Sequence, residues 1–522
     1  MPKDNKYFNL YICIFLIIFS FSLNFYVGSN GVFPVDSFIH YDNGYRILLG
    51  DAPVKDYWIV HGFIIDYIQA IFFKIFGNNW YSYLIHSSLF NVAITVSSYF
   101  LLKTFKINIY LVVILSISIA VLAYPVSGTP FLDLHSTFFT LMAIYCLVFG
   151  IHKESDISWF YSSIFLCLAF FSKQVPAAYT IIGLSFINIY FAINSKKLNI
   201  FIYFITGAIL FLVLMIIFLK IHQIPFQDFI LQLFLFPPSI GTNRYGLYEL
   251  GFKNIFLDYK FIYIIFIPIV IINILNLVKL KNYHQSKDFK IFLVLFVFTI
   301  STLFHQIYTK NQIYIFSLIP ILMGFLLYYK KFLQLKVKKY MTYLIVGICI
   351  FTTTKYHTRF NIERKFHELN KTVLSNSIKA SSIDIKFSGL NWISPNFKNP
   401  KEEIDLIKSF LSILKNENEN IMLITQYNFF SSLLGKKLYS PSRTYDSISY
   451  PRKNTKYFEK YRNHLIDIIK KNDINKIYIF EKLSSLNMNE KIFNYIPKEC
   501  FRRNDLNDHL VVLKIKKCPK LK

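Results

Sequence analysis

Long apolar runs recur along the first two thirds of the chain, and short polar segments separate them. Many of these runs approach the roughly 20 residues that an α-helix needs to cross about 30 Å of hydrocarbon. We therefore expect a membrane protein whose helices span the bilayer. The eleven predicted spans cover residues 8–27, 79–102, 107–124, 131–150, 158–174, 175–193, 199–220, 260–279, 288–306, 312–329 and 340–354.

The pattern changes in the last third of the chain. Short apolar segments at 421–425 and 476–480 are each preceded by an amphipathic stretch, at 402–414 and 461–471 respectively. Alternating helical and β-rich segments are typical of an α/β domain. The sequence thus predicts a polytopic α-helical membrane protein of about 11 transmembrane helices with a soluble carboxy-terminal α/β domain.

The chain divides into two predicted domains. Residues 1–354 form the transmembrane domain, and its first long loop, residues 28–78, is expected to carry interfacial helices. Residues 355–522 form the soluble domain. The run at 8–27 follows basic residues like a signal peptide, but it is long and no A-x-A-like site follows it, so we interpret it as a retained first span.

Composition agrees with this pattern and excludes one class of partner. Hydrophobic residues make up 54% of the chain and charged residues 17%, which is more apolar than soluble proteins of this length. The formal net charge of +27 suggests nucleic-acid binding, yet many of the Lys and Arg residues punctuate apolar helices instead of a polar surface. We expect membrane lipids, and no nucleic acid, as partners.

Basic residues predict the orientation, because Lys and Arg gather in cytoplasmic connections. One alternating set of connections holds Lys3, Lys6, Lys103, Lys106, Lys153, Lys196, Lys197, the lysines of 279–290 and those of 330–339. The other set holds several aspartates and both long loops, residues 28–78 and 221–259. We predict that both long loops and the soluble domain lie outside the inner (plasma) membrane of a bacterium. In that oxidising compartment Cys500 and Cys518 could form a disulfide.

The first long loop holds most of the candidate chemistry. Asp36 follows the first span almost directly, so its carboxylate is expected at the membrane boundary, where partial desolvation could raise its basicity. Such a group suits a general base acting on a hydroxyl or amine. Alternatively, Asp36 caps an interfacial helix over Ser37 to Leu49 that Gly50 ends.

Further features of this loop are the run Gly44-Tyr-Arg-Ile-Leu-Leu-Gly50-Asp-Ala-Pro53, then Asp56-Tyr57-Trp58, His61-Gly62 and an interfacial helix over 64–76. With Asp36, they resemble the loop between the first two helices of GT-C glycosyltransferases. These polyprenyl-phosphate-sugar-dependent enzymes include protein O-mannosyltransferases and the lipid A aminoarabinose transferase. The resemblance covers the topology of about the first 350 residues, and its specific motif is confined to this loop.

The resemblance implies that Asp36 is the catalytic aspartate, which deprotonates the acceptor while phosphate leaves the anomeric carbon with inversion. Asp133 matches a position that often holds a second acidic residue and is predicted to be catalytic too; alternatively it caps its helix. Many relatives carry an acidic pair where this chain has Asp36-Ser37. Some carry Lys-Pro-Pro where it has His61-Gly62-Phe63, so the phosphate contact of that lysine would fall to His61 or another cation.

Other polar residues at the predicted outer ends of spans are candidate substrate-binding residues. Lys173 and Gln174 interrupt an apolar stretch, where a cation is costly unless it is paired, snorkels to the interface or binds a lipid phosphate. The full set is His40, Asp56, His61, Lys173, Gln174, Arg244, His305 and Lys310. No metal or other cofactor is required, although Asp36, Asp56 and Asp133 could supply oxygen ligands to a divalent cation.

Together with these features, the resemblance implies an inverting hexosyl- or pentosyltransferase that moves a sugar from a polyprenyl-phosphate-linked donor to a lipid, glycan or protein acceptor. A glycolipid transporter or flippase is an alternative, although transporters place polar residues near the midplane and often show internal repeats. A polysaccharide polymerase or ligase shares the outward site and stays open. The soluble domain is expected to bind the acceptor or cover the site, so deletion after about residue 360 should leave a folded membrane part and weaken acceptor use.

Overall fold

The computed structural model describes residues 6–195, 197–245, 251–309, 314–369, 374–446, 448–482, 486–516 and 518. They form two compact units. The helical unit comprises Met1–Ser29, Leu84–Ile216 and Tyr245–Asn370, and the mixed unit comprises Asn30–Tyr83, Ile217–Arg244 and Lys371–Lys522. The first long loop thus packs with the carboxy-terminal residues, whereas the sequence analysis counted it with the spans.

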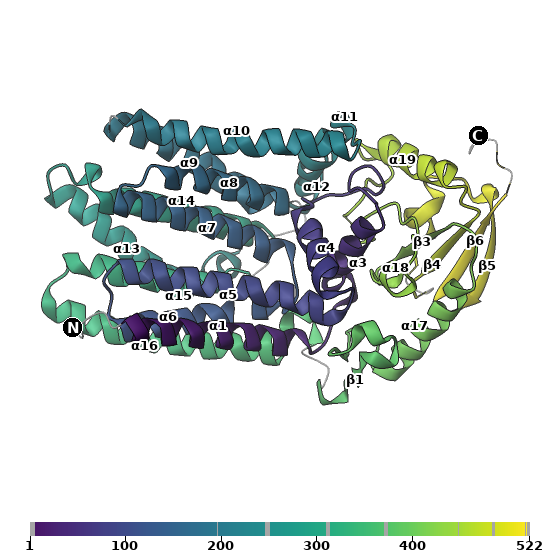
Figure 1. Ribbon diagram of the computed structural model, residues 1–522, viewed down its shortest axis with the longest axis horizontal. Coiled ribbons are helices and arrows are strands. Elements are labelled where there is room, and N and C mark those ends of the chain that lie inside the picture. Colours follow the sequence, from purple (N-terminus) through teal and green to yellow (C-terminus); the bar gives the residue numbers. More distant parts are fainter. Residues whose placement is uncertain are drawn as a thin grey trace. The chain divides into compact units, whose positions relative to one another are not determined.

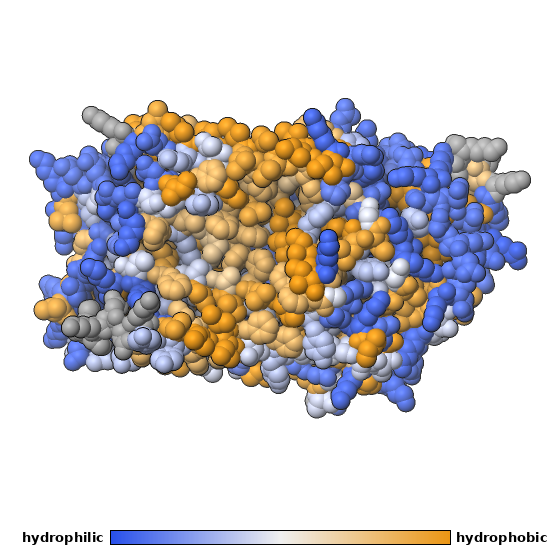
Figure 2. Space-filling view, in the orientation of Figure 1, coloured by the Kyte–Doolittle hydropathy of each residue, from blue (hydrophilic) through white to orange (hydrophobic). Residues whose placement is uncertain are grey.

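Apolar helices that run side by side build the helical unit (Figure 1). They are α1 (Lys6–Gly28), α5 (Trp80–Thr104), α6 (Ile109–Leu122), α7 (Leu132–Lys153), α8 (Ile157–Ser172), α9 (Gln174–Ser195), α10 (Leu198–Ile221), α13 (Lys260–Lys279), α14 (Lys287–Thr309), α15 (Leu318–Tyr329) and α16 (Leu335–Tyr356). Each predicted span overlaps one of these helices, although α15 covers only residues 318–329 of the span predicted at 312–329, whose first two residues lie outside the described part of the chain. Figure 2 shows apolar side chains gathered over the middle of this bundle, as expected for a surface in contact with lipid.

Within the described residues, 8 helices are long and apolar enough to cross a membrane: α1, α5, α6 with the turn that follows it, α7, α9, α10, α13 and α14. The chain is therefore a multi-pass membrane protein. The other three predicted spans correspond to α8 of 16 residues, α15 of 12 and α16 of 22. The number of eleven crossings stays a prediction.

Basic connections between helices meet at one end of the helical unit. Lys287 Nζ, at the start of α14, lies 2.7 Å from Glu154 Oε1, which follows α7, and donates to His152 O at 3.3 Å. Lys331 Nζ, which follows α15, pairs with Asp288 Oδ1 at 2.5 Å. The connections α7–α8, α13–α14 and α15–α16 therefore lie together, as the alternating order of the predicted spans requires.

Buried polar side chains link the helices of this unit. The Asn24 side-chain amide lies 2.9 Å from Ser87 Oγ, which joins α1 to α5. Asn91 Nδ2 donates to Ser20 O at 2.9 Å and to Ala120 O at 3.0 Å, which joins α5 to α1 and α6. Because lipid offers no hydrogen-bond partners, such groups must be satisfied inside the protein, and these bonds fix how the three helices pack.

The carboxy-terminal part of the mixed unit contains a 4-stranded sheet of order β3-β4-β6-β5. The strands β3 (Ile421–Thr425) and β4 (Lys476–Phe480) are parallel; α17 (Pro400–Lys415) precedes β3, and α19 (Phe458–Lys471) connects β3 to β4. Both strands coincide with the predicted apolar segments, and both helices with the predicted amphipathic stretches. Two parallel strands joined by a crossover helix form an α/β arrangement. The predicted α/β domain is therefore confirmed.

The rest of the sheet is an antiparallel hairpin that the sequence analysis did not predict. It consists of β5 (Phe501–Asn507) and β6 (Leu510–Ile515). Of β5, only Phe501 is buried, so the strand lacks the alternation of apolar and polar positions that reveals a half-buried strand. Cys500, directly before β5, is disulfide-bonded to Cys518, which follows β6.

Shorter elements complete the mixed unit. The strands β1 (Ile378–Lys379) and β2 (Asn391–Trp392) pair antiparallel, and α18 (Phe430–Leu434) follows β3. The first long loop forms α2 (Pro34–Ser37), α3 (Ile39–Leu48) and α4 (Ile64–Phe76). The second contributes α11 (Phe226–Ile230) and α12 (Phe236–Tyr245).

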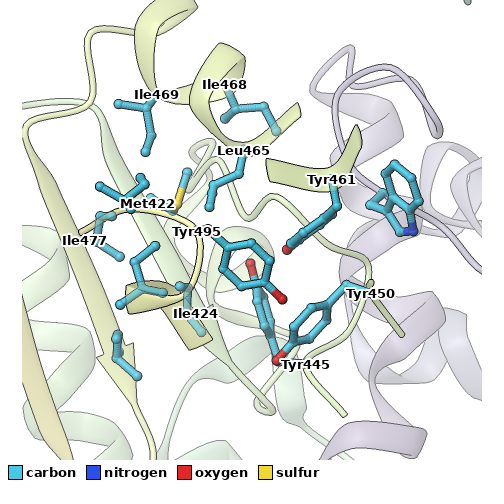
Figure 3. Close-up of a cluster of buried hydrophobic side chains, with 14 of the residues drawn as sticks. Met422, Ile424, Tyr445, Tyr450, Tyr461, Leu465, Ile468, Ile469, Ile477 and Tyr495 are labelled. Atoms are coloured by element: carbon cyan, nitrogen blue, oxygen red, sulfur yellow. The ribbon is translucent and has the colours of Figure 1, made fainter. Parts of the chain in front are cut away.

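A buried cluster of apolar and tyrosine side chains lies between the sheet and α19 (Figure 3). Ile424 of β3, Ile477 of β4 and Leu465 of α19 belong to it. Trp58 of the first long loop is 2% exposed and belongs to the same cluster, with its ring centroid 5.5 Å from that of Tyr461. The loop is therefore part of the hydrophobic core of the mixed unit.

The contact between Gly28 and Gly128 predicts a stability effect in the helical unit. Gly128 has a φ of +76°, and a Cβ atom added to it would lie 2.5 Å from Gly28 Cα. We expect Gly128→Ala to lower the free energy of unfolding by about 2 kcal/mol or more, because backbone strain and overpacking add. Denaturation of the purified protein in detergent measures this. The control, Gly347→Ala in α16, meets no atom within 4 Å and should be neutral or stabilising; equal effects of both variants would contradict the expectation.

Candidate active site

Asp36 lies inside the short helix α2, at the start of the first long loop. Pro34 suits the first turn of α2, because its missing N–H needs no partner there. Phe33 occupies the N-cap position of α2, and Phe38 occupies that of α3. The interpretation of Asp36 as the cap of a helix over 37–49 is therefore wrong.

Two anchors within the mixed unit hold Asp36 in place. Before it, Val32 N donates to Ile393 O at 2.9 Å. After it, Phe38 is fully buried, and its ring centroid lies 5.7 Å from that of Trp392. Asp36 itself is half-buried. A carboxylate that is rigidly held and still partly accessible meets the geometric demand on a general base.

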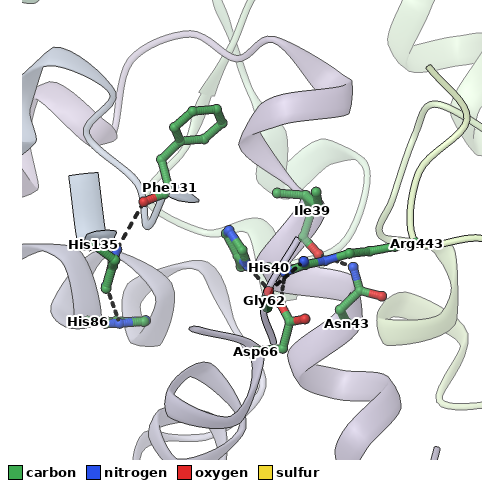
Figure 4. Close-up of polar contacts among 9 residues, drawn as sticks. All are labelled: Ile39, His40, Asn43, Gly62, Asp66, His86, Phe131, His135 and Arg443. Carbon is green, nitrogen blue, oxygen red and sulfur yellow. Dashed lines mark hydrogen bonds and ion pairs between the residues drawn. The ribbon is translucent and has the colours of Figure 1, made fainter. Parts of the chain in front are cut away.

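A buried ionic cluster joins α3, α4 and the carboxy-terminal part of the mixed unit (Figure 4). His40 Nδ1 donates to Asp66 Oδ1 at 2.6 Å, and Arg443 Nη2 donates to the same oxygen at 2.8 Å. Arg443 Nη1 also donates to Gly62 O at 2.9 Å. The side chains of His40 and Asp66 are 0% exposed and that of Arg443 is 2% exposed. The cluster is thus inaccessible to solvent and connects α3, α4 and the segment that carries Arg443.

The charges in this cluster compensate one another. A buried carboxylate is stable only when it is paired and hydrogen-bonded, and Arg443 supplies that pairing for Asp66. Burial lowers the pKa of His40, although the bond to Asp66 opposes this effect. His40 therefore stays neutral at neutral pH, with its proton on Nδ1. Because its side chain is enclosed, His40 links α3 to α4 in this structure, and its predicted role in substrate binding stays a prediction.

Asp56 and His61, the other two candidates of the loop, are more accessible. Asp56 Oδ2 accepts a hydrogen bond from Ala52 N at 2.8 Å, and Asp56 Oδ1 lies 3.6 Å from Lys471 Nζ. One side of the Asp56 carboxylate thus closes a turn, and 25% of the side chain remains exposed. His61 is half-buried.

In the helical unit, three predicted site residues lie together. Lys173 Nζ donates to Asp133 Oδ1 at 2.6 Å, and His305 Nε2 lies 3.7 Å from the same oxygen. Asp133 lies in the first turn of α7, Lys173 directly follows α8 and His305 lies near the end of α14. Phe131 occupies the N-cap position of α7 and no side chain caps the helix, so the interpretation of Asp133 as a cap is wrong.

This cluster can bind an anion. The side chains of Asp133, Lys173 and His305 are 5%, 16% and 6% exposed. Burying the Lys173 ammonium in an apolar stretch is costly, and its ion pair with Asp133 offsets that cost. An ammonium group has three N–H donors, and Asp133 accepts one of them. Lys173 can therefore donate to a second anion while Asp133 keeps it in place.

Two histidines fix the start of α7 (Figure 4). His135 Nδ1 lies 3.1 Å from Phe131 O, and His135 Nε2 lies 3.0 Å from His86 Nε2. A carbonyl oxygen only accepts, so His135 carries its proton on Nδ1 and accepts from His86 through Nε2. Because His86 belongs to α5, this chain of bonds ties α5 to the helix turn that holds Asp133.

The connection that leads into α7 is also held from inside the helical unit. Arg364 is 0% exposed, and it donates through Nη1 to Pro125 O at 3.1 Å and through Nη2 to Ser127 O at 2.8 Å. Ser87 Oγ donates to Gly128 O at 2.9 Å. These bonds satisfy carbonyl groups that lack partners in a helix, and they leave the start of α7 little freedom.

The remaining candidates contribute less to these clusters. Gln174, the first residue of α9, is buried. The side chain of Arg244 and the whole of Lys310 lie outside the described residues. Among the residues that the structure describes, no group of three His, Cys, Asp or Glu residues could hold a metal ion.

Sequence reasoning missed three residues that organise these clusters. Asp66 left a signal, because it is an acidic residue within the apolar stretch 64–76. Arg443 and Arg364 left none, since each lies in a polar segment and their partners are carbonyl oxygens or residues far along the chain. Asp42 of α3 is a further buried carboxylate of this loop, and burial raises its pKa to about 6.

Comparisons with known proteins agree with the expected fold. Residues 60–219 match the family model of dolichyl-phosphate-mannose-protein mannosyltransferases, a match that begins after the segment with Asp36. No curated protein matches the chain by sequence. The crystal structure of ArnT from Cupriavidus metallidurans bound to undecaprenyl phosphate is similar over 97% of this chain and 98% of that chain, with a TM-score of 0.51 and 11% identity.

The apo structure of the same ArnT matches over 96% and 97% of the two chains, with a TM-score of 0.49 and 10% identity. At 11% identity, the likeness to the structure with undecaprenyl phosphate concerns the fold. The predicted resemblance to GT-C membrane glycosyltransferases is therefore confirmed at the level of the fold.

The buried pair of Lys173 and Asp133 predicts a non-additive stability effect. Lys173→Met leaves the Asp133 carboxylate buried without its cation, so we expect a loss of about 3–5 kcal/mol in the free energy of unfolding. The double variant Lys173→Met/Asp133→Asn should recover most of this loss. Unfolding in mixed detergent micelles is measured for the wild type, for Lys173→Met, for Asp133→Asn and for the double variant. Additive effects of the two substitutions would show that the pair does not form.

Arg443 is predicted to stabilise the first long loop. Arg443→Met removes the cation from the buried Asp66 carboxylate and should cost about 3–5 kcal/mol. Tryptophan fluorescence during denaturation reports this, because Trp58 lies in the core of the mixed unit. The control is Arg503→Met, which breaks the exposed pair with Asp505 and should cost about 1 kcal/mol or less. An Arg443 variant as stable as the control would refute the structural role.

Proposed function

We propose that this protein is an inverting glycosyltransferase that takes a sugar from a polyprenyl-phosphate donor. The observation that carries the proposal is the similarity in fold, over 97% of the chain, to a protein crystallised with undecaprenyl phosphate. The partial match to a mannosyltransferase family that uses dolichyl phosphate mannose supports the same donor class. A lipid-linked donor also suits a chain whose helices lie in the membrane.

In this proposal Asp36 is the general base. It takes a proton from the acceptor hydroxyl or amine as the acceptor atom bonds to the anomeric carbon. The bond between that carbon and the phosphate oxygen breaks, and polyprenyl phosphate leaves with the electron pair. Attack opposite the leaving group inverts the anomeric configuration. The position of Asp36, half-buried between two anchors, supports this role, since proton transfer requires a fixed carboxylate that the substrate can reach.

Lys173 is the proposed cation for the lipid phosphate. Its ammonium group can donate to a second anion while Asp133 and His305 surround the first contact. Charge-assisted hydrogen bonds of this kind stabilise the negative charge that develops on a departing phosphate. Asp133 then acts by positioning Lys173, which revises its predicted role as a second catalytic carboxylate.

We further propose that the mixed unit lies outside a bacterial inner membrane, where the acceptor is a lipid, a glycan or a protein. The connections that carry Lys287 and Lys331 lie at one end of the helical unit, and such clusters are typical of the cytoplasmic side. The disulfide between Cys500 and Cys518 also favours an oxidising compartment for the carboxy-terminal residues.

The test is sugar transfer by the purified protein in liposomes, from a panel of polyprenyl-phosphate sugars. Asp36→Asn keeps the shape of the side chain but cannot accept the proton, so we expect transfer to fall by about 10² or more. The matched control is Asp508→Asn, an exposed carboxylate beside β6, which should keep wild-type transfer.

If the wild type and Asp36→Asn transfer sugar equally well, Asp36 is not the base. If the wild type is inert across the panel but moves labelled glycolipid between leaflets, the protein is a transporter and the proposal is wrong.

A further inference from the structure

A cavity of about 630 Å³ lies within the mixed unit, and Asp36 is not among the residues that line it. Residues of the first long loop, of the segment around α11 and of the region from β3 to α19 line it. Its volume falls inside the range of about 300–1,000 Å³ that is typical of small-molecule sites. The candidate catalytic chemistry described above does not use it, although Asp56 belongs to its wall.

The backbone around this cavity is held in unusual conformations. Val54 and Tyr439 both line it, and their φ angles are +76° and +41°. A positive φ is rare for a β-branched residue such as Val54. Two bonds hold it there: Val54 N donates to Tyr57 O at 3.1 Å, and Val54 O accepts from Gln232 Nε2 at 3.0 Å. Strained residues that the surrounding structure fixes in this way are typical of ligand sites.

The charges of the cavity wall nearly cancel. The cations are Arg46, Lys55, Lys437, Lys470 and Lys471, and the carboxylates are Asp51, Asp56, Asp228 and Asp467. Several pair with one another: Asp51 Oδ2 accepts from Arg46 Nε at 3.0 Å, and Asp51 Oδ1 lies 2.7 Å from Lys437 Nζ. The wall therefore offers many donors and acceptors but little net field for a strongly charged ligand.

Three charged groups of the wall remain available to a ligand. Within the described part of the chain, the side chains of Asp228, Asp467 and Lys470 take part in no ion pair within 4.0 Å and in no hydrogen bond, whereas Lys55 Nζ donates to His222 O at 3.3 Å. Asp228 is partly buried, and burial raises its pKa. His464 adds a neutral group, because burial lowers its pKa to about 4, and its Nε2 is buried with no hydrogen-bond partner among the described residues.

A wall of this kind suits a ligand with many hydroxyl groups. Each hydroxyl both donates and accepts, so it can bond to a carboxylate and to an ammonium group at once. The half-buried aromatic ring of Tyr439 adds an apolar contact. The four aspartates would repel a polyanion, and the five basic side chains would repel a polycation. The chemistry thus favours a neutral saccharide over either.

We propose that this cavity binds the neutral saccharide part of the acceptor. The inference rests on the proposed function in naming the acceptor, but the binding of a saccharide needs neither donor nor transfer. In this proposal Val54 and Tyr439 shape the cavity. Asp228, Asp467 and Lys470 bind the hydroxyl groups of the saccharide.

The test measures binding of soluble trisaccharides to the full-length protein in nanodiscs by calorimetry. The probes are two neutral trisaccharides, of hexose and of N-acetylhexosamine units, and a hexuronic acid trisaccharide. We expect at least one neutral probe to bind more tightly than the acidic one. Asp228→Asn/Asp467→Asn should weaken that binding at least tenfold, whereas the control Asp405→Asn, exposed on α17, should not change it.

Lys470→Gln provides a second test, because Lys470 is exposed and its replacement should leave the fold intact. It should weaken binding severalfold at an unchanged melting temperature. The inference is overturned if the wild type binds no neutral probe, if the acidic probe binds more tightly, or if the cavity variants bind like the control. Transfer without saccharide binding would sink this inference alone, and saccharide binding without any transfer would sink the proposed function alone.

Discussion

The buried contact between Arg443 and Asp66 is the constraint on which the mixed unit depends. A carboxylate that is 0% exposed cannot stand alone, so the helix α4 folds in place only when residue 443 reaches it. The backbone around this contact is bonded as well, since Arg443 N donates to Trp58 O and Trp58 N to Pro441 O, each at 2.9 Å. The carboxy-terminal residues are therefore structural partners of the loop that carries Asp36. Deletion after residue 360 would remove those partners and expose the core around Trp58.

Buried hydrogen bonds and an ion pair also hold the cluster of Asp133, Lys173 and His305 in the helical unit. Buried polar groups, chiefly Arg364, His86 and His135, bind the turns that lead into α7, and the pair of Asp133 and Lys173 closes the cluster. Breaking such a bond in an apolar surrounding leaves a buried polar group without a partner, which costs free energy. The arrangement is therefore rigid. Rigidity matters here because a phosphate-binding cation or a base must be held close to its productive geometry.

The sequence predicted the elements well where one physical signal dominated. Apolar runs gave helices at each predicted span, and the strands at 421–425 and 476–480 fall on the predicted residues because their side chains are buried on both faces. The hairpin of β5 and β6 escaped because β5 is exposed after Phe501. The long-range partners escaped as well: Asp66 and Arg443 are 377 residues apart, and no local pattern connects them. Among the site residues, the grouping of Asp133, Lys173 and His305 needed the three-dimensional packing of α7, α8 and α14.

The measurement that most directly tests the central claim is the stereochemistry of the transferred sugar. A polyprenyl-phosphate donor of defined anomeric configuration is incubated with the protein and an acceptor, and the product is examined by proton NMR. Direct displacement by a base-activated acceptor predicts the opposite anomeric configuration in the product. Retention of configuration would indicate a covalent intermediate on the enzyme and would contradict the role given to Asp36.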